Sequence, residues 1–229
     1  MGSVVVGIDS SWVSPTYLGP PGRFGGSGER YLAARPGSLS GSPAGRLYVQ
    51  TMNESSTGYS FEGFGHSDDN GLTWTVRRRE IPRMTTVVAD PRARNGVFTT
   101  PASRTSRGSF NTSLYPILHS DDGGLTWREW SRTARLVTAM AVDATVSRMI
   151  VAIESGALLE TTDHGETWRE LNGPPGVSEY RDLSISPFDP NVLFAVTATT
   201  PGRTEAWVFR GPGEIRPGPA PAQVPGITP

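Results

Sequence analysis

Three aspartates stand in three copies of one short motif, and such a set of carboxylates could act as acids and bases or hold a metal ion. The shared pattern is Ser/Thr-x-Asp-x-Gly-x-Thr-Trp, whose five fixed positions occur three times, far beyond chance. The run Asp68-Asp69-Asn70-Gly71 lacks the spaced later carboxylate of an EF-hand-type calcium loop. The motif residues are Ser67, Asp69, Gly71, Thr73 and Trp74 in the first copy, Ser120, Asp122, Gly124, Thr126 and Trp127 in the second, and Thr161, Asp163, Gly165, Thr167 and Trp168 in the third.

The residue types of this motif favour a tight turn between two strands. The aspartate caps backbone amides, and the glycine takes a positive φ. The threonine suits the start of the return strand, and the tryptophan buries a large ring. We therefore interpret Asp69, Asp122 and Asp163 as structural, and we expect each tryptophan to anchor its own repeat unit.

Histidine and cysteine give no sign of a metal site. His66 and His119 each stand directly before a motif serine, which indicates a repeated structural position, and His164 lies inside the third motif. Cysteine is absent, which excludes thiol catalysis and thiolate ligands. We expect no metal and no cofactor.

Glycoside hydrolysis would need two carboxyl groups that face one sugar. The acids most easily mistaken for such a pair are Glu154, Glu160, Asp182 and Glu205. Each also fits a solvated strand or turn, so we assign no catalytic residue.

The elements that carry these residues repeat along the chain. Each unit has an apolar strand, a polar turn and a second apolar strand upstream of the motif. If Tyr48, Phe98, Ile150 and Phe194 are equivalent, the units are separated by 50, 52 and 44 residues. About four short strands fit in each step, which is the content of a propeller blade. The sequence thus predicts an all-β propeller of about four four-stranded blades.

The ends of the chain differ from its middle. In residues 1–29 we predict one strand, Val4–Ile8, which could pair with the last blade and close the ring, and a Gly-rich arm. Residues 30–216 carry the repeats, although no motif follows the third strand of the fourth unit. Residues 217–229 are rich in proline and glycine, and we expect an extended tail. The N-terminus lacks the basic region of a signal peptide.

Composition excludes several classes of protein. The 229 residues are 36% hydrophobic and 19% charged, with a net charge of −1. No run approaches the roughly 20 apolar residues of a membrane helix. A near-neutral chain has no global field for nucleic acid, so we expect neither nucleic-acid binding nor membrane insertion. The absence of lysine is typical of a GC-rich genome.

The three motifs resemble the Asp-box, or BNR, repeat of sialidases, xyloglucanase-type glycosidases, sortilin-like receptors and the photosystem II assembly factor. The segment Asp189-Pro190-Asn191-Val192-Leu193-Phe194 is similar to the xyloglucanase and assembly-factor branch. The resemblance implies that each box is the turn between the third and fourth strands of a blade, on the outer rim. Members usually have six or more blades. Four blades therefore imply either a small closed ring or an incomplete arc that another chain completes.

Arginine also recurs once in each unit. Arg30, Arg83, Arg135 and Arg181 precede or enter the first strand, in steps of 53, 52 and 46 residues. First strands line the channel of a propeller, so the four side chains could form a ring that binds an anion or a partner. In the alternative, each arginine pairs with a nearby acid such as Glu29, Glu80 or Asp182.

These observations favour a non-enzymatic propeller that binds other protein chains or assembles with copies of itself. A virion protein, from the tail or head of a phage with a GC-rich host, is the setting that we predict. The location that we favour is a virion or the extracellular space. The alternative is a secreted glycan-binding or glycan-hydrolysing protein of the sialidase or xyloglucanase type.

Overall fold

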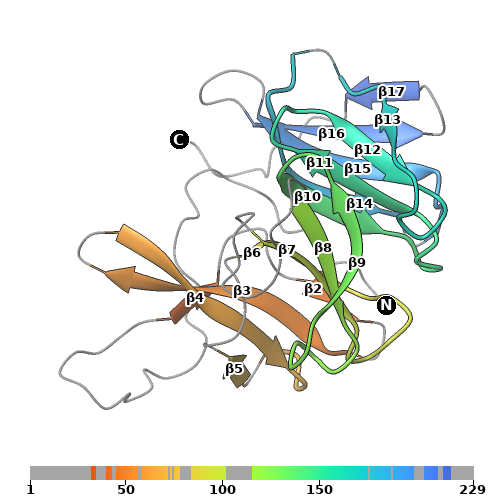
Figure 1. Cartoon of the computed structure of the whole chain (residues 1–229). Helices are drawn as coiled ribbons and strands as arrows, with labels where there is room; N and C mark the ends of the chain where they lie inside the picture. Colours follow the sequence, from red (N-terminus) through yellow and green to blue (C-terminus); the bar gives the residue numbers. More distant parts are fainter. Residues whose placement is uncertain are drawn as a thin grey trace, which may run out of the picture.

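The computed structural model contains four antiparallel sheets that stand side by side as blades (Figure 1). Each sheet is built from one continuous stretch of the chain, in chain order from its inner to its outer strand. The structure describes residues 32–34, 40–42, 45–55, 58–71, 73, 75–77, 84–101, 115–174, 176–186, 188–198, 204–210 and 214–217. Within these residues, no helix is long and apolar enough to span a membrane.

The first blade has a divided inner strand. Two short strands, β1 and β2, both pair with β3, and β4 and β5 follow outward. The bounds of these strands are β1 (Leu32–Ala34), β2 (Ser40–Gly41), β3 (Leu47–Ser55), β4 (Gly58–Ser67) and β5 (Thr75–Arg77).

The other three blades have four strands each, which confirms the predicted fold class. The second contains β6 (Met84–Ala89), β7 (Val97–Pro101), β8 (Tyr115–Ser120) and β9 (Arg128–Thr133); the third contains β10 (Val137–Val142), β11 (Met149–Ile153), β12 (Leu158–Thr161) and β13 (Arg169–Leu171); the fourth contains β14 (Glu179–Ile185), β15 (Val192–Ala198), β16 (Thr204–Arg210) and β17 (Glu214–Pro217). Pro217, which the sequence analysis assigned to the tail, is the last residue of β17. The predicted strand at Val4–Ile8 and residues 218–229 lie outside the described residues.

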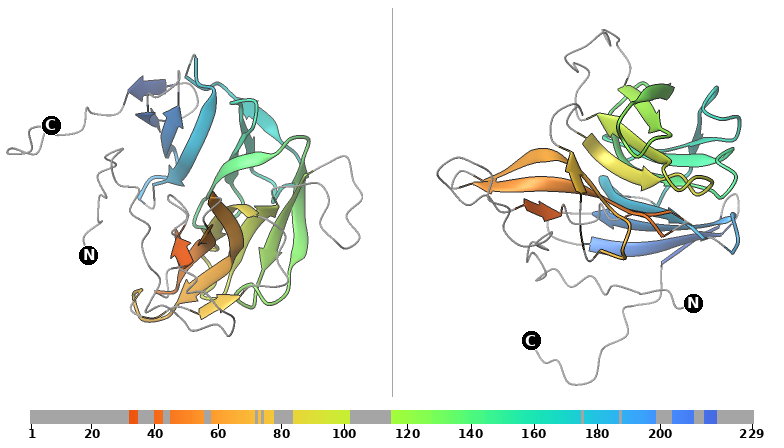
Figure 2. Two further views of the ribbon diagram at one scale, coloured as in Figure 1. Left: turned by 90° about the vertical axis from the view of Figure 1, so that its left-hand side faces the viewer. Right: turned by 90° about the horizontal axis from the view of Figure 1, so that it is seen from below.

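The blades follow one another in an arc. The inner strand β10 lies beside β6 and β14, and β6 lies beside β2 and β3. The views in Figure 2 show the same succession from the first blade to the fourth. Among the described strands, no comparable contact joins the fourth blade back to the first.

Apolar side chains pack between blades, because successive residues of a strand point to opposite faces of its sheet. In the second blade, Val87, Ala89 and Val97 pack against the first blade. Phe98 and Ile117 point the other way, into a cluster with the third blade. A third cluster joins the third and fourth blades in the same manner. The core of the protein therefore consists of the three interfaces between neighbouring blades.

One position shows what each interface does. In every blade, a backbone hydrogen bond closes the turn between the first two strands. The residue two places after the carbonyl that accepts this bond is equivalent in all four blades. In the first three blades its side chain packs toward the following blade. Three residues at this position are completely buried, but the fourth is 46% exposed, because no described blade follows the last one. These residues are Tyr48, Phe98, Ile150 and Phe194.

Replacing Phe98 with alanine should lower the free energy of unfolding by about 3–5 kcal/mol, because the change empties a fully buried site between two blades. Phe188→Ala is the matched control, since Phe188 is 91% exposed, and it should change stability by less than about 0.5 kcal/mol. Urea denaturation followed by tryptophan fluorescence measures both values. Equal losses would contradict the placement of the core between the blades.

Candidate functional site

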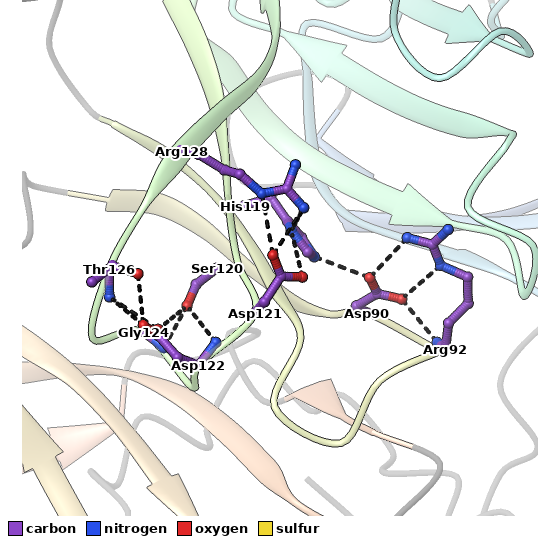
Figure 3. Close-up of polar contacts among 9 residues, drawn as sticks. All are labelled: Asp90, Arg92, His119, Ser120, Asp121, Asp122, Gly124, Thr126 and Arg128. Carbon is purple, nitrogen blue, oxygen red and sulfur yellow. Dashed lines mark hydrogen bonds and ion pairs between the residues drawn. The ribbon is translucent and has the colours of Figure 1, made fainter.

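The second Asp box is a turn that its own side chains close (Figure 3). The Oγ of Ser120 accepts a hydrogen bond from the amide of Gly124 (2.8 Å) and donates one to Asp122 (2.7 Å). Asp122 in turn accepts hydrogen bonds from the amide (2.9 Å) and the hydroxyl (2.6 Å) of Thr126. Gly123 and Gly124 have positive φ values, which only glycine adopts without strain. The turn therefore leaves few polar groups of its own unsatisfied.

The other two boxes repeat this geometry. In the third, Thr161 replaces the serine and accepts a hydrogen bond from the amide of Gly165 (2.9 Å), while Thr167 donates to Asp163 (2.5 Å). The first box has the same bonds among Ser67, Asp69, Gly71 and Thr73. Trp74, the last residue of that box, lies outside the described residues. All three turns join the third strand of a blade to the fourth.

These hydrogen bonds hold the box aspartates in their ionised form. The hydroxyl and amide of Thr167 lower the pKa of Asp163 to about 2. Burial acts against the shift at Asp122, but bonds from Thr126 and Ser120 still lower its pKa to about 2. A carboxylate that is ionised and bonded in this way is a poor general acid at neutral pH.

The glycine and tryptophan of a box contact the preceding blade. A Cβ atom on Gly124 would lie 2.3 Å from the ring of Phe64, and Trp127 meets that ring edge-on at 6.0 Å between centroids. In the third box, Trp168 donates to the Oγ of Ser131 at 3.1 Å. The expectation that each tryptophan anchors its own unit was therefore wrong: Trp127 and Trp168 join one blade to the blade before it.

A buried polar network lies beside the second box (Figure 3). The Nε2 of His119 is 3.0 Å from Asp90, and both side chains are almost inaccessible to solvent. The Nδ1 of His119 faces Arg128 at 3.1 Å and Asp121 at 3.3 Å. Both ring nitrogens of His119 therefore lie within hydrogen-bonding distance of protein side chains, so the imidazole serves to bind Asp90, Asp121 and Arg128 together. Burial opposes the shift, but bonds from His119 and Arg92 hold the pKa of Asp90 well below its usual range.

The third blade places a buried acid at the same position. Glu160 stands directly before the box, as His66 and His119 do, and its side chain is 2% exposed. Arg148 donates to it at 2.6 Å, and Arg169 forms a second ion pair with it. The expectation that Glu160 lies on a solvated strand or turn was wrong. Its place directly before the motif was the signal that could have identified it.

The other acids that could suggest a glycosidase lie on separate elements. Glu154 follows β11 and is 3.8 Å from Arg135. Asp182 lies on β14, where desolvation raises the pKa of its carboxyl group, and Glu205 lies on β16. Within the described residues, no three His, Cys, Asp or Glu side chains are grouped so that they could hold a metal ion.

Two of the four recurrent arginines can be placed. Arg135 lies two residues before the inner strand β10, and Arg181 lies within the inner strand β14. Each has an acid at 3.8 Å: Glu154 for Arg135, and Glu179, rather than the suggested Asp182, for Arg181. Arg30 and Arg83 lie outside the described residues, so the arginine ring stays a prediction.

Solved structures share this arrangement of strands, whereas no protein-family model and no curated protein matches the sequence. The GH74 xyloglucanase of Xanthomonas campestris is similar over 81% of this chain and 30% of its own, with 17% identity and a TM-score of 0.50. A Hadza microbial sialidase is similar over 79% of this chain and 45% of its own, also with 17% identity and a TM-score of 0.50. The chain thus spans less than half the length of either protein. At this identity the likeness shows the fold alone, a set of β-propeller blades.

Replacing Asp122 with alanine should cost about 1 kcal/mol of stability at pH 7, through lost capping hydrogen bonds. The pKa of Asp122 is lowered in the folded state, so its contribution is present above the unfolded pKa of about 4 and is lost as the pH falls through about 2. The difference between wild type and variant in urea denaturation should therefore shrink over that window. Glu170→Ala, on the exposed edge strand β13, is the control. A difference that stays constant down to pH 2 would contradict the assignment.

Gly124→Ala should destabilise the protein by at least about 2 kcal/mol more than Gly176→Ala. Both glycines have a positive φ, so both substitutions cost about 1 kcal/mol of backbone strain. A Cβ at Gly176 would meet nothing within 4 Å, whereas one at Gly124 would clash with Phe64 on the preceding blade. Thermal and urea denaturation measure the difference. Equal effects would mean that the box does not pack tightly against the preceding blade.

Proposed function

We propose that this chain is a non-enzymatic β-propeller module that binds other protein chains in an assembly. The observation that carries the proposal is the 46% exposure of Phe194, at a position where the other three blades bury their residue completely. The same face of the fourth blade holds the half-buried Val192, Val196 and Val208. A contiguous apolar face of this kind on a sheet is a typical site of protein–protein contact.

The charged groups also support a role without catalysis. Asp90 and Glu160 are buried in ion pairs with arginines, and the box carboxylates are bonded within their own turns. A glycosidase would need two carboxyl groups that remain available to one sugar. The carboxylates of Asp90, Glu160 and the boxes are instead bonded to groups of the protein itself, which is the second ground for proposing a role without catalysis.

The alternative function is glycan binding or glycan hydrolysis. It is favoured by the likeness to a xyloglucanase and a sialidase, although that likeness concerns the fold. The virion setting that the sequence predicts has no support from these structural neighbours.

Purified chain should release no product from sialosides, xyloglucan or other β-glucans, and it should bind no glycan on an array. Chromatography of reducing ends and a fluorogenic sialoside assay measure hydrolysis, with an active sialidase and an active xyloglucanase as positive controls. Turnover above the buffer background would refute the proposal. If turnover occurs, Asp182→Asn and Glu154→Gln are the first variants to test, because desolvation raises the pKa of Asp182 and the ion pair of Glu154 with Arg135 is long, at 3.8 Å.

A further inference from the structure

We propose that the outer face of the fourth blade binds the first blade of a second copy of this chain, in a head-to-tail contact. This inference rests on the proposed function and names the partner. It follows from the way in which consecutive blades of one chain already contact one another.

The receiving surface is the face of the fourth blade that points away from the third. Register places Phe194 opposite Val208, and Val196 opposite Ala206, on neighbouring strands of this face. The residues that alternate with these along β15, such as Leu193 and Ala195, lie on the opposite face of the sheet. They pack against the third blade and are at most 2% exposed. We call the surface formed by Val192, Phe194, Val196, Ala206 and Val208 the end face.

The end face is more apolar than the equivalent faces that are covered. By strand register, Val208 of the fourth blade, which has no box, is equivalent to the residues directly before the boxes of the first three blades, which are His66, His119 and Glu160. A terminal repeat that faced water would be expected to carry polar residues there. The fourth blade instead presents a valine beside an exposed phenylalanine, which fits another protein surface.

The two preceding interfaces show what such a face receives. The face of the first blade takes the second box, with Gly124 and Trp127 against Phe64. The face of the second blade takes the third box, with Gly165 and Trp168 against Ser131. In both cases the occupant is the Asp box of the next blade.

The first blade offers such an occupant at the other end of the arc. It carries a box at positions 67–74, and no described blade precedes it. Its Leu47 is only half-buried, whereas the equivalent Val97, Met149 and Leu193 are at most 2% exposed against a preceding blade. The two ends of one arc are therefore complementary, and two copies that share this contact twice form a closed ring.

The first experiment measures the mass of the full chain by light scattering over a range of concentrations. Wild type should have the mass of two or more chains, and Phe194→Glu should raise the dissociation constant about 100-fold by placing a charge in an apolar contact. Leu125→Glu is the matched control, because Leu125 is 51% exposed in the second box, away from both ends. It should assemble as wild type does. A wild type with the mass of one chain, or a Phe194→Glu variant that still assembles, would overturn the proposal.

The second experiment identifies the two surfaces, and the absence of native cysteine makes it specific. Ala206→Cys and Thr75→Cys chains, mixed and oxidised, should give a disulfide-linked dimer that contains one of each. Ala206 is exposed on the end face and its replacement keeps the Phe194 ring, and Thr75 is exposed at the start of β5. A chain that carries both changes should link to other chains. If that double variant closes only on itself, the ring is completed within one chain and the proposal is wrong. Linkage of Ala206→Cys only to itself would also overturn it.

The outcomes separate this inference from the proposed function. A chain that hydrolyses glycans refutes the proposed function whatever its mass. A chain with no activity and the mass of one molecule refutes only the second copy as partner.

Discussion

The burial of both faces of each sheet is the constraint on which this fold depends. A four-stranded sheet with apolar residues on both faces cannot stay folded alone in water, because each exposed face loses the free energy of burial. The second and third blades meet this requirement with a neighbour on each side. Each blade is therefore stabilised by its contacts with neighbouring blades, as in other repeat proteins.

The Asp box allows a polar turn to pack closely against the neighbouring blade. A turn that packs against Phe64 must leave no amide or carboxylate unsatisfied, since an unbonded buried polar group costs about 1–3 kcal/mol. Ser120 and Asp122 meet that need with local hydrogen bonds, and Gly124 lets the backbone approach the ring. The fourth blade uses another solution: Phe209 takes the position of the box serine and packs into the cluster with the third blade.

The repeat could be read from the sequence, whereas the contacts that depend on neighbouring blades could not. The motif spacing predicted the four blades, and the equivalence of Tyr48, Phe98, Ile150 and Phe194 matches the register of the turns. Local patterns do not identify the neighbouring blade that a side chain contacts, so the contact of Trp127 with Phe64 of the preceding blade was not predicted. Val146 shows the same limit: a β-branched residue takes a φ of 60°, against its local preference, and it is buried in the cluster between the second and third blades.

The covered and uncovered blades differ in the composition of their outer faces. Where a blade is followed by another, its face combines a buried large side chain with a paired polar group, such as Phe98 with His119. Where no described blade follows, the polar group is replaced by Val208 and the aromatic ring of Phe194 remains. A terminal blade adapted to face water would have no exposed aromatic ring at the position of Phe194 and would keep a polar residue at the position of Val208, because terminal repeats normally have a polar outer face. The fourth blade has the opposite pattern, which is the composition that the proposed contact with another chain requires.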